Sequence, residues 1–335
     1  MIKKKALIIG ISGQDGFLLS QFLEKKKYQV YGVYQNIKSF KKIKIKKNKL
    51  FKINTLNFLK IKKLIKKVKP DEIYNFSGIT DLKTSENNII ENEKSNNFFL
   101  LKLYTYFTNN TRIKIFNSLS SELFKKNKKG KKKIDKINDF FPETPYAIAK
   151  LSSYYYSLYF RKKYNMKIYN GFFFNHDSIY RQKRFIVPQI IEILLKAKKN
   201  IYFSPFIIRN ILSRKDFGSA KSYVEAAWCI MQNDIPDDYI IGSGTTYSLL
   251  NIIKIISKKI KLKIKVIRTN QNYKILSNDK IIIFGKYNKN EPFLIADQKT
   301  IKKKTNWKNK ISYKKTLDEM ILNYKKNLFI EKKIK

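Results

Sequence analysis

A short apolar segment near the N-terminus is followed at once by a glycine-rich turn, and this order constrains the fold more than any other feature. Residues 5–9, Lys-Ala-Leu-Ile-Ile, have the length of a buried strand, and Gly10, Gly13 and Gly16 precede a helical pattern that begins at Phe17. A strand, glycine turn and helix in this order place backbone N–H groups and a helix N-terminus against a pyrophosphate. Glycine is required because a side chain would block the phosphates. A glycine-rich turn at a sheet edge is the alternative.

Beyond this turn, apolar runs of strand length alternate with stretches of helical pattern. The expected strands cover residues 6–9, 28–33, 72–76, 113–117 and 166–174, and the expected helices cover residues 98–107, 146–164, 185–195 and 219–232. This alternation predicts an α/β fold in which helices cover both faces of a parallel sheet. The lysine-rich segment at residues 125–135 is expected to be a solvated loop.

Length and composition limit the classes of protein that this chain can be. With 335 residues, 43% of them hydrophobic, the chain is long enough for about two domains around a sizeable core. Its single cysteine, Cys229, excludes an internal disulfide framework and a cysteine-clustered zinc site, and we expect no metal. No apolar run approaches the roughly 18 residues of a membrane span, and the apolar start is too short for a signal peptide. We therefore expect a cytoplasmic protein without a membrane partner.

The formal net charge of +47 invites a nucleic-acid interpretation. Basic clusters lie at residues 41–49, 60–69, 125–133 and 299–304. Only seven of the 72 basic residues are arginine, however, and the lysines are spread along the whole chain. Arginine is the residue that makes bidentate contacts to bases and phosphates. We therefore expect no specific nucleic-acid partner, and only non-specific binding at low salt.

A tyrosine and a lysine lie four residues apart in the segment at residues 144–150, Thr-Pro-Tyr-Ala-Ile-Ala-Lys. A tyrosine hydroxyl, whose pKa is about 10, needs a nearby cation if it is to act as a general base at neutral pH. Residues i and i+4 share a helix face, so Lys150 can be that cation for Tyr146 and can also hold a ribose. A chance pair is the alternative, because the chain has 22 tyrosines and many more lysines. Together with the glycine turn, the pair predicts a nicotinamide-dependent enzyme that works on a sugar carbinol.

Several further motifs follow one another in a distinctive order. The segments lie at residues 10–16, 70–75, 120–123, 144–150, 164–166, 170–171, 174–178, 216–218, 220–221, 223–224 and 247–248. This order resembles the extended short-chain dehydrogenase/reductases and, within them, the GDP-mannose 4,6-dehydratases. The similarity runs from residue 3 to about Trp307, and its most specific motifs are Gly-Gln-Asp-Gly, Pro-Tyr-Ala-Ile-Ala-Lys and Phe-Asn-His-Asp-Ser.

The resemblance implies a Rossmann-type doubly wound parallel sheet with a smaller α/β substrate-binding domain. The dinucleotide-binding domain is expected at residues 1–177, with a returning segment near 212–242, and the substrate domain at residues 178–211 and 243–335. The resemblance also implies NADP or NAD as a tightly bound cofactor that is regenerated in each cycle. A nucleotide-sugar substrate and a homo-oligomer, either a dimer or a tetramer, are implied in the same way.

The resemblance further implies a role for each residue of a site. The catalytic residues are Ser120, Glu122, Tyr146 and Lys150. The cofactor-binding residues are Gly10, Ser12, Gly13, Gln14, Asp15, Gly16, Gln35, Asn36, Asn54, Tyr146, Lys150 and His176. The substrate-binding residues are Asn175, Arg181, Lys215 and Glu291. A structural role is the alternative for His176, and a carboxylate that begins a helix and pairs with lysine is the alternative for Glu122.

The implied activity is that of a nucleotide-sugar 4,6-dehydratase that converts GDP-mannose to GDP-4-keto-6-deoxymannose. Tyr146 would take the C4 hydroxyl proton while hydride passes to the cofactor. Glu122 would take the C5 proton and protonate the departing C6 hydroxyl, and the hydride would return to C6. Two alternatives stay open. One is a related NAD(P)-dependent nucleotide-sugar 4-epimerase or 4-ketoreductase, and the other is a basic binding protein without catalysis.

The chain departs from the family pattern at several binding positions. Where the dehydratases carry two arginines for the 2′-phosphate of NADP, it has Gln35 and Asn36. The lysines that could supply that charge are Lys38, Lys41 and Lys42. This chain has Asn54 where the family has an acidic residue, and Lys215 where the family has a phosphate-binding arginine. It has Lys183 and Arg184 in place of Glu-Thr, and residues 288–291 in place of Arg-Pro-x-Glu. These changes leave open whether the cofactor is NADP or NAD. They also leave open whether the substrate carries guanine and mannose.

Overall fold

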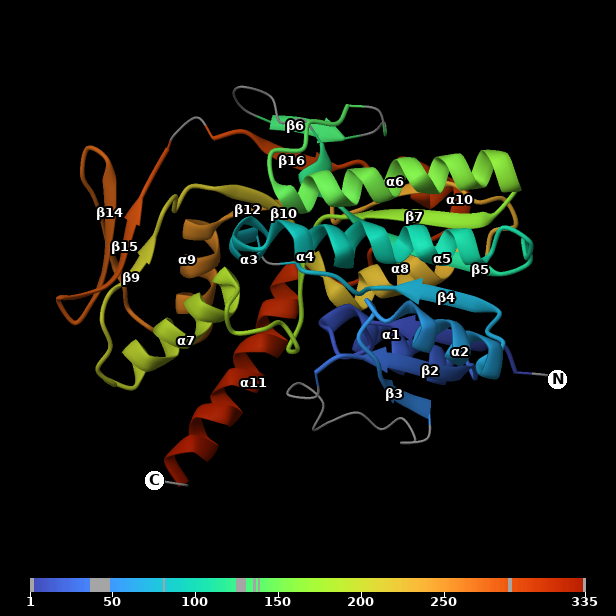
Figure 1. The fold of residues 1–335 in the computed structure, drawn as a ribbon. Helices are drawn as coiled ribbons and strands as arrows, with labels where there is room; N and C mark the ends of the chain where they lie inside the picture. The colour runs from blue at the N-terminus through green and yellow to red at the C-terminus, as the bar shows by residue number, and fades with distance from the viewer. Residues whose placement is uncertain are drawn as a thin grey trace.

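A seven-stranded parallel sheet forms the centre of the molecule (Figure 1). The computed structural model describes residues 3–36, 49–80, 82–124, 131–134, 137, 139–288 and 291–333. The strands are β1 (Lys5–Ile9), β2 (Gln29–Tyr34), β3 (Leu50–Lys52), β4 (Glu72–Asn75), β5 (Lys114–Ser120), β7 (Lys167–Phe173) and β11 (Asp238–Ile241). Their order, β11-β7-β5-β4-β1-β2-β3, runs outward in both directions from the boundary between β1 and β4. The sheet is therefore doubly wound, and its switch point lies at that boundary.

Helices cover both faces of this sheet. They are α1 (Gln14–Lys25), α2 (Phe58–Val68), α3 (Leu82–Asn87), α4 (Ile89–Glu93), η2 (Lys94–Phe98), α5 (Phe99–Tyr106), η3 (Ser121–Leu123), α6 (Pro145–Tyr164) and α8 (Ala220–Met231). On one face, Ala6 and Ile8 of β1 pack in a cluster with α1 and α8. On the other face, Leu7 and Ile9 pack in a cluster with α2 and α5. A strand that is covered on both faces carries apolar side chains on both of them. This explains why residues 6–9 of β1 show no alternation of apolar and polar residues.

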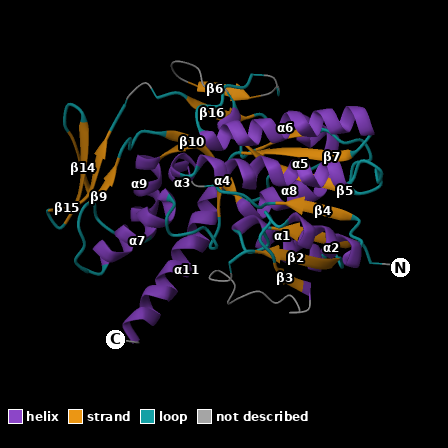
Figure 2. Cartoon of the chain, in the orientation of Figure 1, coloured by secondary structure: helices purple, strands orange, loops and turns teal. Residues whose placement is uncertain are grey.

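The remaining strands form three smaller sheets (Figure 2). They are β8 (Asn175–Asp177), β10 (Arg214–Ser219) and β12 (Thr246–Ser248) in one sheet, β9 (Phe206–Ile208), β13 (Lys265–Arg268), β14 (Asn272–Ser277) and β15 (Lys280–Lys286) in a second, and β6 (Lys131–Ile134) with β16 (Phe293–Ala296) in a third. The accompanying helices are α7 (Ile186–Lys198), α9 (Leu249–Lys259), α10 (Lys299–Thr305) and α11 (Tyr313–Lys333). α7, α9 and α11 share a separate hydrophobic core with the four-stranded sheet.

The α/β fold class with a doubly wound parallel sheet is confirmed. Every strand and helix predicted above is present, with bounds that differ by a few residues. The solvated loop predicted at residues 125–135 is wrong for residues 131–134, which form β6 and pair in parallel with β16. The lysine-rich composition hid this strand because its partner lies about 160 residues later in the sequence. The division into two domains at the predicted boundaries stays a prediction.

A row of polar residues crosses the centre of the main sheet. Asn75, Asn117, Asn170 and Asp238 stand in register on β4, β5, β7 and β11. The Asn117 side chain donates to Asn170 at 3.1 Å, and the Asn170 side chain donates to Asp238 at 2.8 Å. A one-residue slip of β5, β7 or β11 would break these two hydrogen bonds, so they favour the observed register. The motif residue Asn170 is therefore explained by strand pairing, whereas the Asn75 side chain accepts from the Ser77 hydroxyl at 2.6 Å.

Candidate active site

The glycine turn joins β1 to α1 at the switch point of the sheet. Gly10 has a φ of +86°, and a Cβ atom there would lie 2.8 Å from the backbone of Phe76 and Ser77. A Cβ atom at Gly16 would lie 2.4 Å from the Gly10 carbonyl oxygen. Both glycines are therefore required by the packing of the chain itself. Gly13 differs, because a Cβ atom there would meet only the Gly10 carbonyl oxygen, at 3.4 Å.

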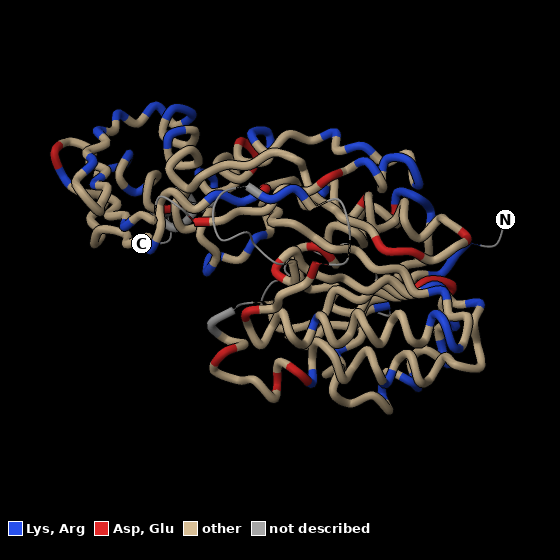
Figure 3. Tube along the Cα trace, turned by 90° about the horizontal axis from the view of Figure 1, so that it is seen from above, with Lys and Arg blue, Asp and Glu red and all other residues tan. Residues whose placement is uncertain are grey.

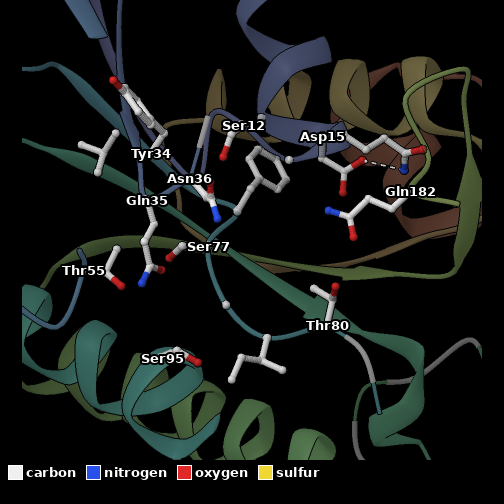
Figure 4. Close-up of a pocket in the computed structure, with 18 of the residues that line it drawn as sticks. Ser12, Asp15, Tyr34, Gln35, Asn36, Thr55, Ser77, Thr80, Ser95 and Gln182 are labelled. Carbon is white, nitrogen blue, oxygen red and sulfur yellow. Dashed lines mark hydrogen bonds between the residues drawn. The ribbon is translucent and has the colours of Figure 1, made fainter. Parts of the chain in front are cut away.

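A cleft of about 320 Å³ lies at the carboxyl ends of β1, β2 and β4. Its lining includes Gly10, Ser12, Gly13, Gln14, Asp15, Gly16, Gln35, Asn36 and Arg181. Figure 4 shows Gln35 and Thr55 at one end of the cleft and Asp15 and Gln182 at the other. Asn54 does not line the cleft; its side chain accepts a hydrogen bond from the Leu56 backbone N–H at 3.0 Å. The cleft fits an extended ligand whose phosphates lie against the glycine turn.

A second cavity of about 380 Å³ adjoins this cleft. Its lining includes Ser120, Glu122, Tyr146, Lys150, Asn175, His176, Arg181 and Lys215. Asp15, Phe76, Ser77, Thr80, Arg181, Arg184 and Phe185 line both spaces. The structure thus brings all four predicted catalytic residues to one cavity, and that cavity is continuous with the glycine-turn cleft.

Ser120 and Glu122 stand where β5 ends and η3 begins. The Ser120 hydroxyl oxygen caps η3 by accepting a hydrogen bond from the Glu122 backbone N–H at 3.2 Å. The same hydroxyl hydrogen-bonds the Tyr146 side chain. Because the Ser120 oxygen already accepts from the backbone, its own proton is free for a second partner. Ser120 therefore links the backbone at Glu122 to the tyrosine.

Tyr146 and Lys150 lie in the first turns of α6, which Thr144 caps and Pro145 begins. Both side chains are buried, and the Lys150 ammonium donates to the Ser118 carbonyl at 2.9 Å. Burial raises the pKa of Tyr146 to about 12 and lowers the pKa of Lys150 to about 8. Burial outweighs the Ser120 hydrogen bond and the Arg181 charge, which both lower the pKa of Tyr146, so the expected activation of the phenol by Lys150 is not seen in the chain alone.

His176 and Asp15 form a buried ion pair beside the glycine turn. Nε2 of His176 lies 3.0 Å from both Asp15 carboxylate oxygens, and Nδ1 lies 2.7 Å from the Phe174 carbonyl oxygen. Both partners are acceptors, so the ring donates from both nitrogens and is an imidazolium. Burial lowers the pKa of His176, but the charge of Asp15, its hydrogen bond to the ring and the hydrogen bond to the Phe174 carbonyl together more than offset this and leave that pKa raised. The ion pair ties the start of α1 to β8.

Of the predicted substrate-binding residues, Asn175, Arg181 and Lys215 line the second cavity, and Glu291 lines a space that adjoins it. Lys215 on β10 forms an ion pair with Glu122, with 2.9 Å between Nζ and Oε1. The Glu122 charge raises the pKa of Lys215. Glu291 lines an adjoining space with Lys215 and Asn175, and it accepts from the Ser213 hydroxyl at 3.1 Å. Arg181 forms an ion pair with Asp177 at 3.3 Å.

Some residues of the site were not predicted. Ser77 and Thr80, which follow β4, line both spaces, and Thr55 and Ser95 line the cleft. Ser77 and Thr80 carry one sequence signal, which is their position after a strand that borders the switch point. Thr55 and Ser95 carry none. Asp216, which begins the motif segment at residues 216–218, uses its carboxylate to accept hydrogen bonds from backbone N–H groups. Lys38, Lys41 and Lys42 lie outside the described residues.

Gly13 gives a test of the cleft that leaves the fold intact. We expect Gly13→Ala to weaken cofactor binding at least about tenfold, because the new methyl group would stand where phosphates approach. Its melting temperature should stay within about 2 °C of the parent, since only one ordinary contact is made. Gly16→Ala should instead lower the melting temperature. Calorimetric titration with NAD and NADP and thermal unfolding measure both effects, and unchanged affinity in Gly13→Ala would place the phosphates elsewhere.

The described residues contain no group of three or more histidine, cysteine, aspartate or glutamate side chains that could hold a metal ion. Among the helices that the structure describes, none is long and apolar enough to cross a membrane.

The fold and the site together define an extended short-chain dehydrogenase/reductase, with a doubly wound sheet, a glycine turn at the switch point and a Tyr-x-x-x-Lys helix. A family model described as GDP-mannose 4,6 dehydratase matches residues 7–320. The chain belongs to this family. Because members of the family are NAD(P)-dependent hydro-lyases, the predicted class of enzyme is confirmed.

Individual relatives agree with this assignment. The chain is 30% identical to the GDP-mannose 4,6 dehydratase of Cricetulus griseus over 347 aligned residues, which cover 95% of this chain and 91% of that protein. The dTDP-glucose 4,6-dehydratase of Bacillus anthracis, solved with NAD, superposes with a TM-score of 0.80 at 16% identity, covering 97% of each chain. RMD of Pseudomonas aeruginosa, solved with NADPH, superposes with a TM-score of 0.77 at 13% identity, covering 97% of this chain and 100% of that one. The two structural likenesses show the fold.

Proposed function

We propose that this chain is a nucleotide-sugar 4,6-dehydratase that acts on GDP-mannose and uses NAD or NADP. The observation that carries the proposal is the Glu122 carboxylate in the same cavity as Tyr146 and Lys150. Oxidation of a carbinol needs a proton acceptor such as the tyrosine, whereas loss of water across C5 and C6 needs a second acceptor for the C5 proton. A 4-epimerase or 4-ketoreductase has no use for that second acceptor.

The residues of the cavity divide the chemistry between them. Tyr146 accepts the C4 hydroxyl proton, and the hydrogen-bonded Ser120 hydroxyl orients its oxygen. Glu122 accepts the C5 proton, which the ketone at C4 acidifies, and gives it to the C6 hydroxyl as that group leaves as water. When hydride reaches C6, C5 takes up the proton that Tyr146 had accepted, so both side chains return to their starting states. A nicotinamide bound in the cleft supplies the acceptor for the C4 hydride and the donor for C6. Lys150, buried in the same cavity, would hold the ribose of that cofactor.

The residues that follow β2 predict weak discrimination between the two cofactors. Gln35 and Asn36 line the cleft, and neither carries a charge for a 2′-phosphate. We expect the dissociation constants of NAD and NADP to differ by less than about a hundredfold, or about 2.7 kcal/mol. Fluorescence titration of the purified protein with both cofactors measures the ratio. A larger preference for NADP would show that Lys38, Lys41 or Lys42 supplies the missing charge.

Isotope transfer distinguishes the proposed reaction from its alternatives. With GDP-mannose deuterated at C4 of the hexose, we expect the label at C6 of a 4-keto-6-deoxy product, read by mass spectrometry and NMR. Glu122→Gln should reduce the cofactor without releasing a deoxy sugar, because C4 oxidation does not use the carboxylate. An epimerase would return the deuterium to C4, and a binding protein would move no label. Deuterium that stays at C4 would rule out the dehydratase, and release of deoxy sugar at the parent rate by Glu122→Gln would rule out the role of Glu122.

Other predictions about partners stay untested. The lysines are distributed over the described chain, as Figure 3 shows, and this supports the prediction of no specific nucleic-acid partner. The predicted homo-oligomer and the cytoplasmic location also stay predictions.

A further inference from the structure

An ion pair crosses the cavity that holds the predicted catalytic residues. Glu122 follows the central strand β5, and Lys215 lies 93 residues later on β10 of the three-stranded sheet. Nζ of Lys215 donates to Oε1 of Glu122 at 2.9 Å. The two charges therefore meet although they belong to different sheets, and both side chains line the same space.

The backbone is held at both ends of this ion pair. The N–H of Glu122 donates to the Ser120 hydroxyl that caps η3. Lys215 stands opposite Tyr247 in the ladder of β10 with β12, and two residues further Phe217 pairs with Asn175 of β8. Because these backbone positions are set by hydrogen bonds, the contact between the two side chains limits where the carboxylate can point.

We propose that Lys215 is a positioning residue for Glu122, whose carboxylate it holds toward the cavity in the charged form that accepts a proton. This inference rests on the proposed function of Glu122. Binding of a substrate phosphate would by itself need no carboxylate beside the ammonium, since that carboxylate neutralises the charge that attracts the phosphate. The other titratable groups that line this cavity are Asp15, Tyr146, Lys150, His176, Arg181 and Arg184. Glu291 lines the adjoining space beside the pair, and its charge acts on Lys215.

The first test measures the carboxylate without turnover. Full-length protein labelled with [δ-¹³C]glutamate is titrated by NMR, and the Glu122 signal is assigned as the one lost in Glu122→Gln. We expect its midpoint to rise in Lys215→Met, because the charged form loses its cation, and to return in Lys215→Arg. The matched control is Lys221→Met, which breaks the Lys221–Glu319 ion pair between α8 and α11. The exposed fractions of its two side chains are similar, 40% and 32%, against 39% and 21% for Lys215 and Glu122. This control should leave the midpoint unchanged.

The second test follows the pH dependence of turnover at saturating GDP-mannose. When a carboxylate loses its neighbouring cation, its pKa rises and it stays protonated up to a higher pH. The loss of activity should therefore be greatest at acidic pH. We expect kcat of Lys215→Met to fall about tenfold or more near pH 6 and to approach the parent value above about pH 8. Lys215→Arg should restore the profile, and Lys221→Met should match the parent.

The outcomes separate this inference from the proposed function. If Lys215→Met raises only KM and leaves the Glu122 titration unchanged, Lys215 is solely an anchor for substrate phosphate and the inference is wrong. If the parent does not dehydrate GDP-mannose, the NMR titration still decides whether Lys215 governs the carboxylate. Circular dichroism checks the fold of each variant. Should Lys215→Met not fold, Lys215→Gln removes the same charge, and an unchanged midpoint in it would overturn the inference.

Discussion

Tyr146→Phe is expected to lower turnover about a thousandfold or more while cofactor affinity stays within about tenfold of the parent value. The variant loses the hydroxyl that we propose accepts the substrate proton, whereas the glycine turn that we expect to face the cofactor phosphates is untouched. Steady-state turnover with GDP-mannose and fluorescence titration with the cofactor measure the two quantities separately.

The matched control for this variant lies on the same helix. Tyr155 is 55% exposed on α6 and does not line the cavity, so Tyr155→Phe should keep turnover close to that of the parent. Near-normal turnover in Tyr146→Phe would remove the tyrosine from the mechanism. A loss of similar size in both variants would point to damage to α6 as a whole.

Asp216→Ala is expected to lower the free energy of unfolding by about 2–4 kcal/mol. The buried carboxylate accepts from the backbone N–H groups of Ser243 at 2.9 Å, Gly244 at 2.9 Å and Ala296 at 3.0 Å. Alanine would leave the buried Ala296 N–H without an acceptor, and an unsatisfied buried donor costs about 1–3 kcal/mol. The N–H groups of Ser243 and Gly244 are closer to water, so the loss of their hydrogen bonds adds less. Urea unfolding followed by circular dichroism measures the change.

Two further variants make this prediction specific. Asp216→Asn should also destabilise the protein, because its amide nitrogen would face N–H donors in place of a carboxylate oxygen. Asp318→Ala removes an exposed aspartate that pairs with Lys259, and we expect a change of at most about 1 kcal/mol. If Asp216→Ala lowers the free energy of unfolding no more than Asp318→Ala does, the Asp216 carboxylate does not hold residues 243–244 and β16 together.

Several elements of the fold could be read from short stretches of sequence. The strand expected at residues 72–76 is β4 (Glu72–Asn75), and the helix expected at residues 146–164 is α6 (Pro145–Tyr164). The signals for such elements are local, since apolar runs, caps and helix periodicity are contained in a few turns or one strand length. β6 was missed because its pairing with β16 is not local.

For the candidate site, the sequence named residues that the structure brings together and one that it does not. Ser120, Glu122, Tyr146 and Lys150 do line one cavity, while Asn54 does not line the cleft where it was expected. A resemblance names positions, but it does not say which side chain turns inward. Asn54 instead closes its own turn by accepting from the Leu56 N–H, as asparagine side chains often do in loops.

The sequence by itself determined the strands and helices predicted above, the glycine turn and the helical spacing of Tyr146 and Lys150. Each of these depends on residues within one element or in the turn that follows it. Only the tertiary structure decided which charges meet. The Asp15–His176 pair joins residues 161 positions apart, and the Glu122–Lys215 pair joins residues 93 positions apart. Such contacts depend on how the smaller sheets dock on the large one, and the energy of an ion pair depends on the burial and distance that docking creates.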